Sequence, residues 1–303
     1  MNILITGATG FIGSNICFNL LENQHNVYGI CRDKSNFEKC AKFKDRVNWI
    51  NSDKENWQDL IKEVHFELLI HSAWAGVSAL ERNDWDIQIA NFRFSKLIFD
   101  FALENNIKKI ISFGSQAEYG IFDHKVSEDF VPYPVDAYGA IKLMTLYYLR
   151  NLAKAHSAQW YWLRVFSLIG QNENRDWLLP KVVNNLLNNQ SISLTKGEQL
   201  YDYMHIDDFL LRMNLIINSS ANFSGVYNLC SGRSVQIREL IISIAKELKV
   251  SESLLNFGAI PYRENQNMFM VGSSNKFDKT FGTLSIEPLE ETIMKIISNY
   301  KSN

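Results

Sequence analysis

The 303-residue sequence has few cysteines, few prolines and almost no net charge. Its four cysteines show neither CxxC nor metal-ligand spacing, which excludes a disulfide scaffold and indicates no metal site; they are Cys17, Cys31, Cys40 and Cys230. The 31 Lys and Arg residues nearly balance the 33 Asp and Glu residues, so the net charge is −2. This balance argues against a broad basic surface, and we therefore expect no nucleic-acid partner.

Long hydrophobic runs are also absent. No stretch of about 18 apolar residues occurs, so nothing in the sequence is expected to span a membrane. The first apolar run, Ile3–Ile5, is too short for the core of a signal peptide. We expect a soluble, cytoplasmic protein with room for about two domains of roughly 100–200 residues each.

Short apolar runs alternate with longer amphipathic ones in the first half of the chain. The expected strands are Ile3–Thr6, Val27–Cys31, Val47–Asn51, Leu68–His71, Ile110–Gly114 and Trp160–Phe166. The expected helices between them are Ile12–Asn23, Trp57–Val64, Trp85–Glu104 and Ala137–Ala155. Strands rich in Ile, Leu and Val are typical of a parallel sheet buried on both faces. The fold class predicted is α/β, with a doubly wound parallel (Rossmann) sheet.

The second half mixes shorter strands with helices. The expected strands are Ser191–Leu194, Gly225–Leu229 and Leu254–Phe257. The expected helices are Leu178–Leu187, Asp207–Ile217, Val235–Leu248 and Leu289–Tyr300. This looser pattern predicts a smaller, mixed α/β C-terminal domain that sends at least one segment back to the large one.

A glycine-rich turn, Thr6–Gly13, follows the first expected strand directly and opens an apolar helix. Gly7 permits the tight turn, Gly10 lets the backbone approach a pyrophosphate, and Gly13 lets the helix pack against the strand. Since the N–H groups and the positive dipole end of the helix face the phosphates, the context predicts a dinucleotide site. Its cofactor-binding residues are Gly7, Thr9, Gly10, Phe11, Ile12 and Gly13.

The end of the second expected strand bears on the choice of dinucleotide. An NAD site usually places Asp or Glu about 20 residues beyond the glycines, on the ribose 2′-hydroxyl. Here Cys31 holds that position and Arg32 follows, and a guanidinium suits the 2′-phosphate of NADP. We expect NADP(H), with NAD as the alternative if Asp33 serves the ribose. Asp53, after the third strand, is a candidate for the adenine amino group or a plain loop residue.

The candidate catalytic residues are Ser115, Tyr138 and Lys142. Tyr138 and Lys142 are four residues apart, which places them on one face of a helix. Ser115 follows an apolar strand, and ligands of open parallel sheets lie beyond the carboxyl ends of the strands. A phenol with a pKa near 10 is a poor acid–base group at neutral pH, and a neighbouring ammonium favours its phenolate. The three residues therefore indicate proton transfer beside a dinucleotide.

With these motifs the chain resembles the extended short-chain dehydrogenase/reductases of the NAD-dependent epimerase/dehydratase type, many of which act on nucleotide sugars. The matching segments are Thr6–Gly13, Asp53, 71–73, Asn91, 114–120, 138–142, 164–170, 201–208, 225–228 and Arg263. The stretches 195–199, 257–263 and 267–271 look like bacterial reductases of 4-keto-6-deoxy nucleotide sugars, CDP-abequose synthase among them.

The resemblance implies a role for each matching residue. Tyr138 would act as acid–base, Lys142 on the nicotinamide ribose, and Ser115 on the sugar oxygen at the reacting carbon. His71, Ala73 and Asn91 would lie at the cofactor. It further implies a homodimer built through the helices and a C-terminal domain that grips the nucleoside diphosphate. We accordingly expect a dinucleotide-binding domain over residues 1–170, with a returning segment near 201–230, and a nucleotide-sugar-binding domain over 171–303.

The candidate substrate-binding residues are Trp74, Ser115, Gln116, Glu118, Ser167, Tyr201 and Arg263. Trp74 either stacks on the sugar or nicotinamide or anchors its own loop. Glu118 either bonds sugar hydroxyls or caps a helix. Arg263 is implied as a pyrophosphate contact, whereas Ser167 and Tyr201 replace the family's usual Asn and Arg.

Departures from the family pattern narrow the expected reaction. Related 4,6-dehydratases carry Thr-Asp-Glu where this chain has Ser115-Gln116-Ala117, so we do not expect dehydration. We expect NADPH-dependent reduction of a 4-keto, 6-deoxy nucleotide sugar at C4, for surface-polysaccharide precursors. The alternatives are an NAD-dependent 4-epimerase and a non-catalytic dinucleotide-binding sensor.

Overall fold

The computed structural model describes residues 1–263 and 266–301. The chain forms two compact units: unit 1 holds residues 1–120, 131–164 and 219–227, and unit 2 holds 121–130, 165–218 and 228–303. The chain leaves unit 1 at residues 121 and 165 and returns to it at residues 131 and 219. The functional domains expected from the sequence, 1–170 with a returning segment near 201–230 and 171–303, stay a prediction. Within the described residues, no helix combines the length and apolar character needed to cross a bilayer.

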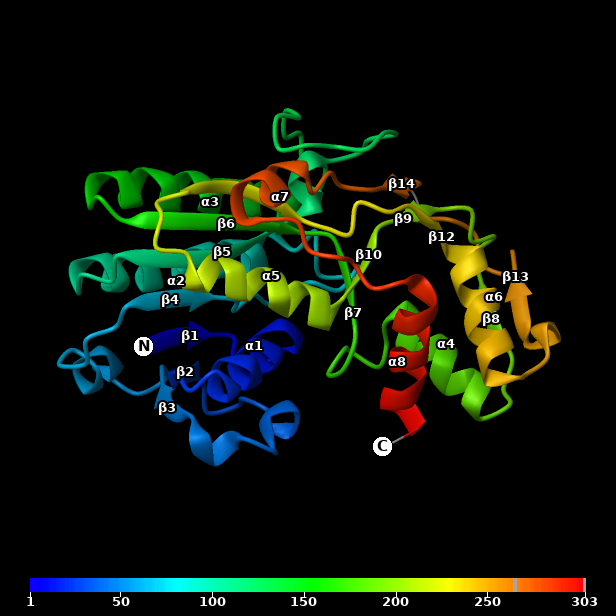
Figure 1. Cartoon of the computed structure of the whole chain (residues 1–303), viewed down its shortest axis with the longest axis horizontal. Coiled ribbons are helices and arrows are strands. Elements are labelled where there is room, and N and C mark those ends of the chain that lie inside the picture. The colour runs from blue at the N-terminus through cyan, green and yellow to red at the C-terminus, as the bar shows by residue number, and fades with distance from the viewer. Residues whose placement is uncertain (264–265, 302–303) are drawn as a thin grey trace. The chain divides into compact units, whose positions relative to one another are not determined.

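Unit 1 contains most of a seven-stranded sheet with the strand order β11-β6-β5-β4-β1-β2-β3 (Figure 1). The strands are β1 (Asn2–Thr6), β2 (Asn26–Cys31), β3 (Asn48–Asn51), β4 (Leu68–His71), β5 (Lys109–Ser115), β6 (Gln159–Val165) and β11 (Gly225–Leu229). β1 pairs in parallel with β2 and β4, and the pairs β2–β3 and β4–β5 are parallel too. The predicted Rossmann sheet is confirmed, and its order reverses between β1 and β4, where such sheets bind ligands.

Helices cover both faces of this sheet. α2 (Trp85–Glu104) and α3 (Ala137–Ala155) pack on the face that presents Leu4, Leu69 and Ile110, in one buried apolar cluster. α1 (Phe11–Glu22) lies outside that cluster and contacts β1 and β2. Because strand side chains alternate between faces, α1 takes the opposite face, where Ile3 and Ile5 point. The strands are therefore buried on both sides, as their Ile- and Leu-rich sequences predicted.

One predicted helix of unit 1 is wrong. The stretch 57–64 forms only a short 3₁₀ turn, Trp57–Leu60, between β3 and β4. Its preceding residue, Asn56, has φ 57°, a left-handed conformation that does not lead into an α-helix. Trp57 and Ile61 are 5% and 3% exposed, and they fasten this connection to the α2/α3 face of the sheet. The apolar spacing that suggested an amphipathic helix therefore arises from the burial of Trp57 and Ile61 in an irregular connection.

Unit 2 combines short strands with helices around its own core. Its helices are α4 (Leu178–Leu187), α5 (Ile206–Asn218), α6 (Ile237–Leu248), α7 (Asn275–Phe281) and α8 (Leu289–Lys301). Its short strands are β7 (Ser167–Ile169), β8 (Ile192–Leu194), β9 (Leu200–Tyr201), β10 (Tyr203–His205), β12 (Val235–Gln236), β13 (Leu255–Phe257) and β14 (Phe269–Met270). Apolar side chains of α4, α6 and α8 gather with those of β8 and β13 in one buried cluster.

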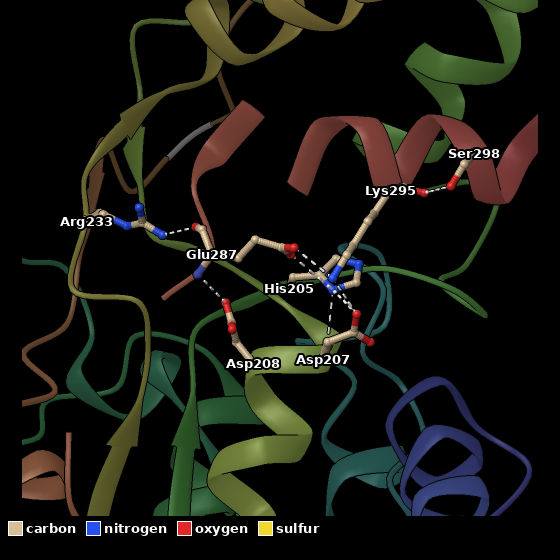
Figure 2. A network of polar contacts seen from close by, with 7 residues as sticks. All are labelled: His205, Asp207, Asp208, Arg233, Glu287, Lys295 and Ser298. Carbon is tan, nitrogen blue, oxygen red and sulfur yellow. Dashed lines mark hydrogen bonds and ion pairs between the residues drawn. The ribbon is translucent and has the colours of Figure 1, made fainter. Parts of the chain in front are cut away.

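Ion pairs fasten α8 to the start of α5 within unit 2. Figure 2 shows the Lys295 ammonium between two carboxylates, 2.8 Å from Asp207 and 2.7 Å from Glu287. His205 Nδ1 lies 3.3 Å from the Asp207 carboxylate. Contact with His205, and then with Lys295, holds the pKa of Asp207 well below its usual range. Arg233 also donates to the Glu287 carbonyl oxygen, so the segment before α8 is held from two sides.

Candidate active site

The glycine turn has the shape that a pyrophosphate requires. Gly7 has φ 69°, and a Cβ there would lie 2.5 Å from the Ala73 nitrogen, so only glycine fits. A Cβ on Gly13 would lie 2.1 Å from the Gly7 oxygen, which brings α1 close to β1. The nearest atom to a Cβ on Gly10 is the Gly7 oxygen at 3.3 Å, so this side of the turn is open. Among the described residues no side chain caps α1 at Gly10, and the helix N-terminus fits a dinucleotide phosphate.

His71 is a structural link beneath this turn. Its ring is 2% exposed and makes two hydrogen bonds, with the Thr6 hydroxyl (2.7 Å) and the Ser95 hydroxyl (2.8 Å). Burial, and then the charge of Lys142, lowers its pKa to about 3, so the ring is neutral at physiological pH. His71 thus joins β1, β4 and α2. Of the predicted cofactor segment, the backbone at Ala73 lies against Gly7.

Asn91 of α2 holds the chain that follows β4. Its amide oxygen accepts from Ala75 N–H and its nitrogen donates to the Ala75 carbonyl, both at 2.9 Å. The neighbouring Gln88, fully buried, accepts from the Trp74 indole N–H at 2.9 Å. Asn91 thus holds the segment that carries Trp74, and its expected contact with the cofactor stays a prediction.

Acidic and basic groups meet at the ends of β2 and β3. Arg32 is exposed, as a group for a 2′-phosphate must be. The carboxylate of Asp33 accepts from the Asn51 side chain at 2.5 Å, and the Asp33 N–H donates to Asp53 at 2.9 Å. The nearby Cys31 thiol has a raised pKa, through burial first and then the charges of Asp33 and Asp53. Both predicted cofactor groups, Arg32 and Asp53, therefore lie at this corner of the sheet.

Ser115, Tyr138 and Lys142 meet where β5 ends and α3 begins, all within unit 1. The side chain of Asp136 caps α3 by accepting from Gly139 N–H at 2.7 Å, which starts the helix one residue before Tyr138. The Ser115 hydroxyl is near enough to the Tyr138 phenol to lower the pKa of that group. Lys142 Nζ lies 5.7 Å from the centre of the Tyr138 ring and donates to a β5 carbonyl at 2.7 Å. The grouping predicted from the sequence is the one that the structure assembles.

The environment of these groups sets their acidity. Burial lowers the pKa of Lys142 to about 7, against a smaller opposite effect from the Glu118 carboxylate. Burial raises the pKa of Tyr138, whereas the Arg82 guanidinium and the Ser115 hydroxyl lower it. A partly buried phenol beside a serine hydroxyl can give a proton to an oxygen, or take one from it.

Three contacts with aromatic rings surround Tyr138 and Lys142. The Trp74 ring centre lies 3.5 Å from Lys142 Nζ, and the ring meets that of Tyr138 edge-on at 6.1 Å. The Arg82 guanidinium lies 4.5 Å from the centre of the Tyr138 ring. Trp74 was a substrate candidate, and its ring covers the lysine. Sequence reasoning missed Arg82, because a lone arginine in a polar loop carries no local signal.

Glu118 takes the capping role, one of its two predicted alternatives. Its side chain is fully buried, and one oxygen accepts from the Ser115 N–H and the Trp162 indole N–H, each at 2.9 Å. The other oxygen accepts from Arg164 Nε at 2.8 Å. Glu118 is therefore a buried ion-pair partner of Arg164 that also accepts from the Ser115 N–H. Gln116, the next substrate candidate, is partly exposed in the same 3₁₀ turn.

The remaining substrate candidates belong to unit 2. Ser167 is partly buried in β7, and its N–H donates to the Asp202 carbonyl at 3.2 Å. The Tyr201 hydroxyl donates to the Asn267 carbonyl at 2.9 Å. Arg263 is exposed in a loop. For a metal, the described residues contain no cluster of three or more His, Cys, Asp or Glu side chains with ligand geometry.

Comparison with known proteins places this site in a family. Residues 3–230 match the NAD dependent epimerase/dehydratase family. A dTDP-6-deoxy-L-talose 4-dehydrogenase (NAD(+)) of Aggregatibacter actinomycetemcomitans is 26% identical over 90% of this chain and 100% of its own. A dTDP-4-dehydro-6-deoxyglucose reductase of Escherichia coli is 26% identical over 88% and 87% of the two chains.

Solved structures share the fold across the whole chain. A UDP-glucose 4-epimerase from Thermotoga maritima with UDP-glucose superposes with a TM-score of 0.87 at 20% identity, covering 100% of this chain and 99% of its own. A dTDP-glucose 4,6-dehydratase from Streptomyces venezuelae with NAD bound gives 0.87 at 18% identity, covering 100% and 98%. At such identities the likeness is one of fold. The match over residues 3–230, with the glycine turn and the Ser115, Tyr138 and Lys142 grouping, shows that this chain is an enzyme of the NAD dependent epimerase/dehydratase family.

Proposed function

We propose that the protein reduces a 4-keto, 6-deoxy nucleotide sugar at C4 with NADPH, supplying precursors of surface polysaccharides. The observation that carries this proposal is the assembled Ser115, Tyr138 and Lys142 set beside an open glycine turn. Two relatives of nearly the same length, named as a 4-dehydrogenase and a 4-keto reductase of deoxysugar nucleotides, support it.

The chain's own residues would manage the proton. When bound, the nicotinamide supplies a hydride to C4 of the sugar. Tyr138 donates its phenolic proton to the C4 oxygen, so the carbonyl becomes an alcohol and the phenol a phenolate that solvent reprotonates. Ser115 hydrogen-bonds the same oxygen and polarises it, and the Lys142 ammonium favours the phenolate. We assign the cofactor contacts to the glycine turn, Arg32, Asp53 and the backbone at Ala73.

The cofactor preference depends on Arg32. The exposed guanidinium can form charge-assisted hydrogen bonds with a 2′-phosphate, so Arg32→Ala should weaken NADPH binding about tenfold and leave NADH binding unchanged. Arg46→Ala is the control, since this exposed arginine already pairs with Glu22. Equal affinity of the Arg32 variant and the parent for NADPH would contradict the preference.

For the substrate, we assign the nucleoside diphosphate to unit 2, with Ser167, Tyr201 and Arg263 as contacts. The exposure of Arg263 and the partial exposure of the other two support this assignment. We further propose a cytoplasmic homodimer. Exposed apolar side chains along α2 and α3 support the dimer: Trp85, Leu97, Met144 and Tyr147.

The second candidate is an NAD-dependent 4-epimerase, favoured by the carboxylates of Asp33 and Asp53 at the ends of β2 and β3. An epimerase returns its hydride to the sugar and keeps its cofactor, whereas a reductase consumes NADPH. Protein purified with one tightly bound NAD per chain would favour the epimerase.

The decisive experiment is a panel of nucleotide-linked 4-keto sugars assayed for NADPH oxidation. We expect turnover with at least one of them, and its loss in Tyr138→Phe with NADPH binding retained. Tyr147→Phe, on the exposed face of the same helix, is the control and should keep full activity. If the parent turns over no member of the panel, the proposed reaction is refuted.

A further inference from the structure

The loop between β4 and α2 brings an arginine onto the ring of Tyr138. The Arg82 guanidinium carbon lies 4.5 Å from the ring centre, within the range of a cation–π contact. The Arg82 side chain is 29% exposed, so water screens its charge only in part. Lys142 is farther from the same ring, at 5.7 Å. Of the two cations, the loop arginine is thus the nearer to the ring.

Three further contacts fix Arg82 to the first turn of α3. Its Nε donates to Asp136 Oδ2 at 2.9 Å, and Asp136 is also the N-cap of the helix. The carbonyl oxygen of Arg82 accepts from the Tyr138 N–H at 2.9 Å. The adjacent Asn83 side chain accepts from Ala137 N–H at 3.2 Å. Backbone and side-chain contacts together therefore hold the guanidinium against the Tyr138 ring, whereas an arginine without such contacts would sample many conformations.

We propose that Arg82 is a positioning residue for Tyr138, which holds the phenol ring in place and adds a second positive charge beside it. The proposal rests on the proposed role of Tyr138 as the acid–base group. Arg82 lies in the β4–α2 loop, outside the Ser115, Tyr138 and Lys142 pattern, so the proposal gives this loop a role in the reaction.

The charges around Tyr138 define what Arg82 adds. The charged groups around the phenol are Arg82, Asp136, Lys142 and Glu118, and the Ser115 hydroxyl also acts on it. Burial raises the pKa of Tyr138, Arg82 and Ser115 lower it, and the Glu118 and Asp136 carboxylates raise it. Arg82 is the largest of the lowering influences.

Arg82 also keeps its charge where Lys142 does not. The pKa of Lys142 is about 7, so at neutral pH this group is an ammonium only part of the time. A guanidinium stays protonated over the whole working range. As the pH rises above 7, Arg82 becomes the main positive charge beside the phenol, and the phenolate retains a cationic partner when the ammonium is lost.

The test follows the titration of one phenol. The ultraviolet absorbance of phenolate is recorded against pH for the parent and for Tyr138→Phe, and the difference between them gives the Tyr138 midpoint. In the Arg82→Gln background, measured against Arg82→Gln/Tyr138→Phe, we expect that midpoint to rise by about one pH unit. Arg82→Lys keeps the charge and loses the planar contact, so its shift should be smaller. Arg150→Gln, which removes an equivalent arginine 4.9 Å from the Tyr147 ring, should leave the midpoint unchanged.

An unshifted midpoint in a folded Arg82→Gln protein would overturn the proposal, as would an equal shift in Arg150→Gln. If Arg82→Gln does not fold, Arg82→Lys decides, because an unshifted midpoint there refutes the contact of the planar guanidinium with the phenol. This titration needs neither cofactor nor sugar. Failure of the sugar panel would therefore refute the proposed reaction and leave the reading of Arg82 intact.

Discussion

The buried ion pair behind Ser115 gives the sharpest stability prediction. Glu118 is fully buried and Arg164 is 3% exposed, with 2.8 Å between their charged atoms. Glu118→Gln keeps the shape of the side chain and an acceptor oxygen for the Ser115 N–H, and it removes the negative charge. The guanidinium of Arg164 cannot lose its proton, so the variant leaves an unpaired cation in a dry interior.

The expected cost follows from that burial. Breaking a buried pair by removing one partner costs about 3–5 kcal/mol, and total stabilities of about 5–15 kcal/mol are usual for globular domains. Since glutamine preserves part of the hydrogen bonding, we expect a loss of about 3 kcal/mol. The Glu22–Arg46 pair has the same 2.8 Å separation, but its side chains are 53% and 49% exposed. Glu22→Gln should therefore cost at most about 1 kcal/mol.

Urea unfolding followed by tryptophan fluorescence measures both variants against the parent. We expect a large fall of the midpoint for Glu118→Gln and almost none for Glu22→Gln. The double variant Glu118→Gln/Arg164→Met should recover part of the loss, because the stranded cation is gone. Equal midpoints for the two single variants would show that burial does not determine how much the Glu118–Arg164 pair contributes to the free energy of unfolding.

Three further outcomes are expected. Gly7→Ala should cost more than about 1 kcal/mol of stability and abolish NADPH binding, measured by nucleotide fluorescence, because its Cβ would lie 2.5 Å from the Ala73 nitrogen. Trp74→Leu should depress activity most near neutral pH in a pH–rate profile, since loss of the ring removes about 1 kcal/mol of stabilisation from the Lys142 ammonium. Trp74→Phe should retain most of the activity. Lys295→Met should lower the unfolding temperature at pH 7, because it removes the pair with the half-exposed Asp207 and the pair with Glu287, which is only 12% exposed. The pKa of Asp207 is lower in the folded state, so this pair stabilises above pH about 4 and the gap between variant and parent should close as the pH falls further.

The parts of the fold that could be predicted are those with local signals. The expected bounds of α2 and α3 agree with the structure, and each helix follows an aspartate that caps it, Asp84 and Asp136. Buried parallel strands can also be predicted, because they are continuous apolar runs in the sequence. The two-residue strands β9, β12 and β14 could not be predicted, because only pairing between distant segments defines them.

The same distinction applies to the site. The glycine turn and the Tyr138 to Lys142 spacing are local patterns, so sequence reasoning found them. Arg82 is 56 positions before Tyr138 and contacts its ring only because two loops meet at the start of α3. The placement of Trp74 on Lys142 is likewise a tertiary contact, and the sequence left its role open.

The interleaved chain path has a consequence for dissecting this protein. Unit 1 needs residues 219–227, which carry most of β11, and these come after residues 165–218 of unit 2 along the chain. A fragment ending at residue 164 would lack the strand that pairs with β6 and would expose a new sheet edge. During synthesis, the sheet can acquire its last strand only after residue 229 has left the ribosome. No single cut of the chain yields both units whole, because each unit is built from separate segments. A fragment that lacks β11 should therefore aggregate through the exposed edge of β6.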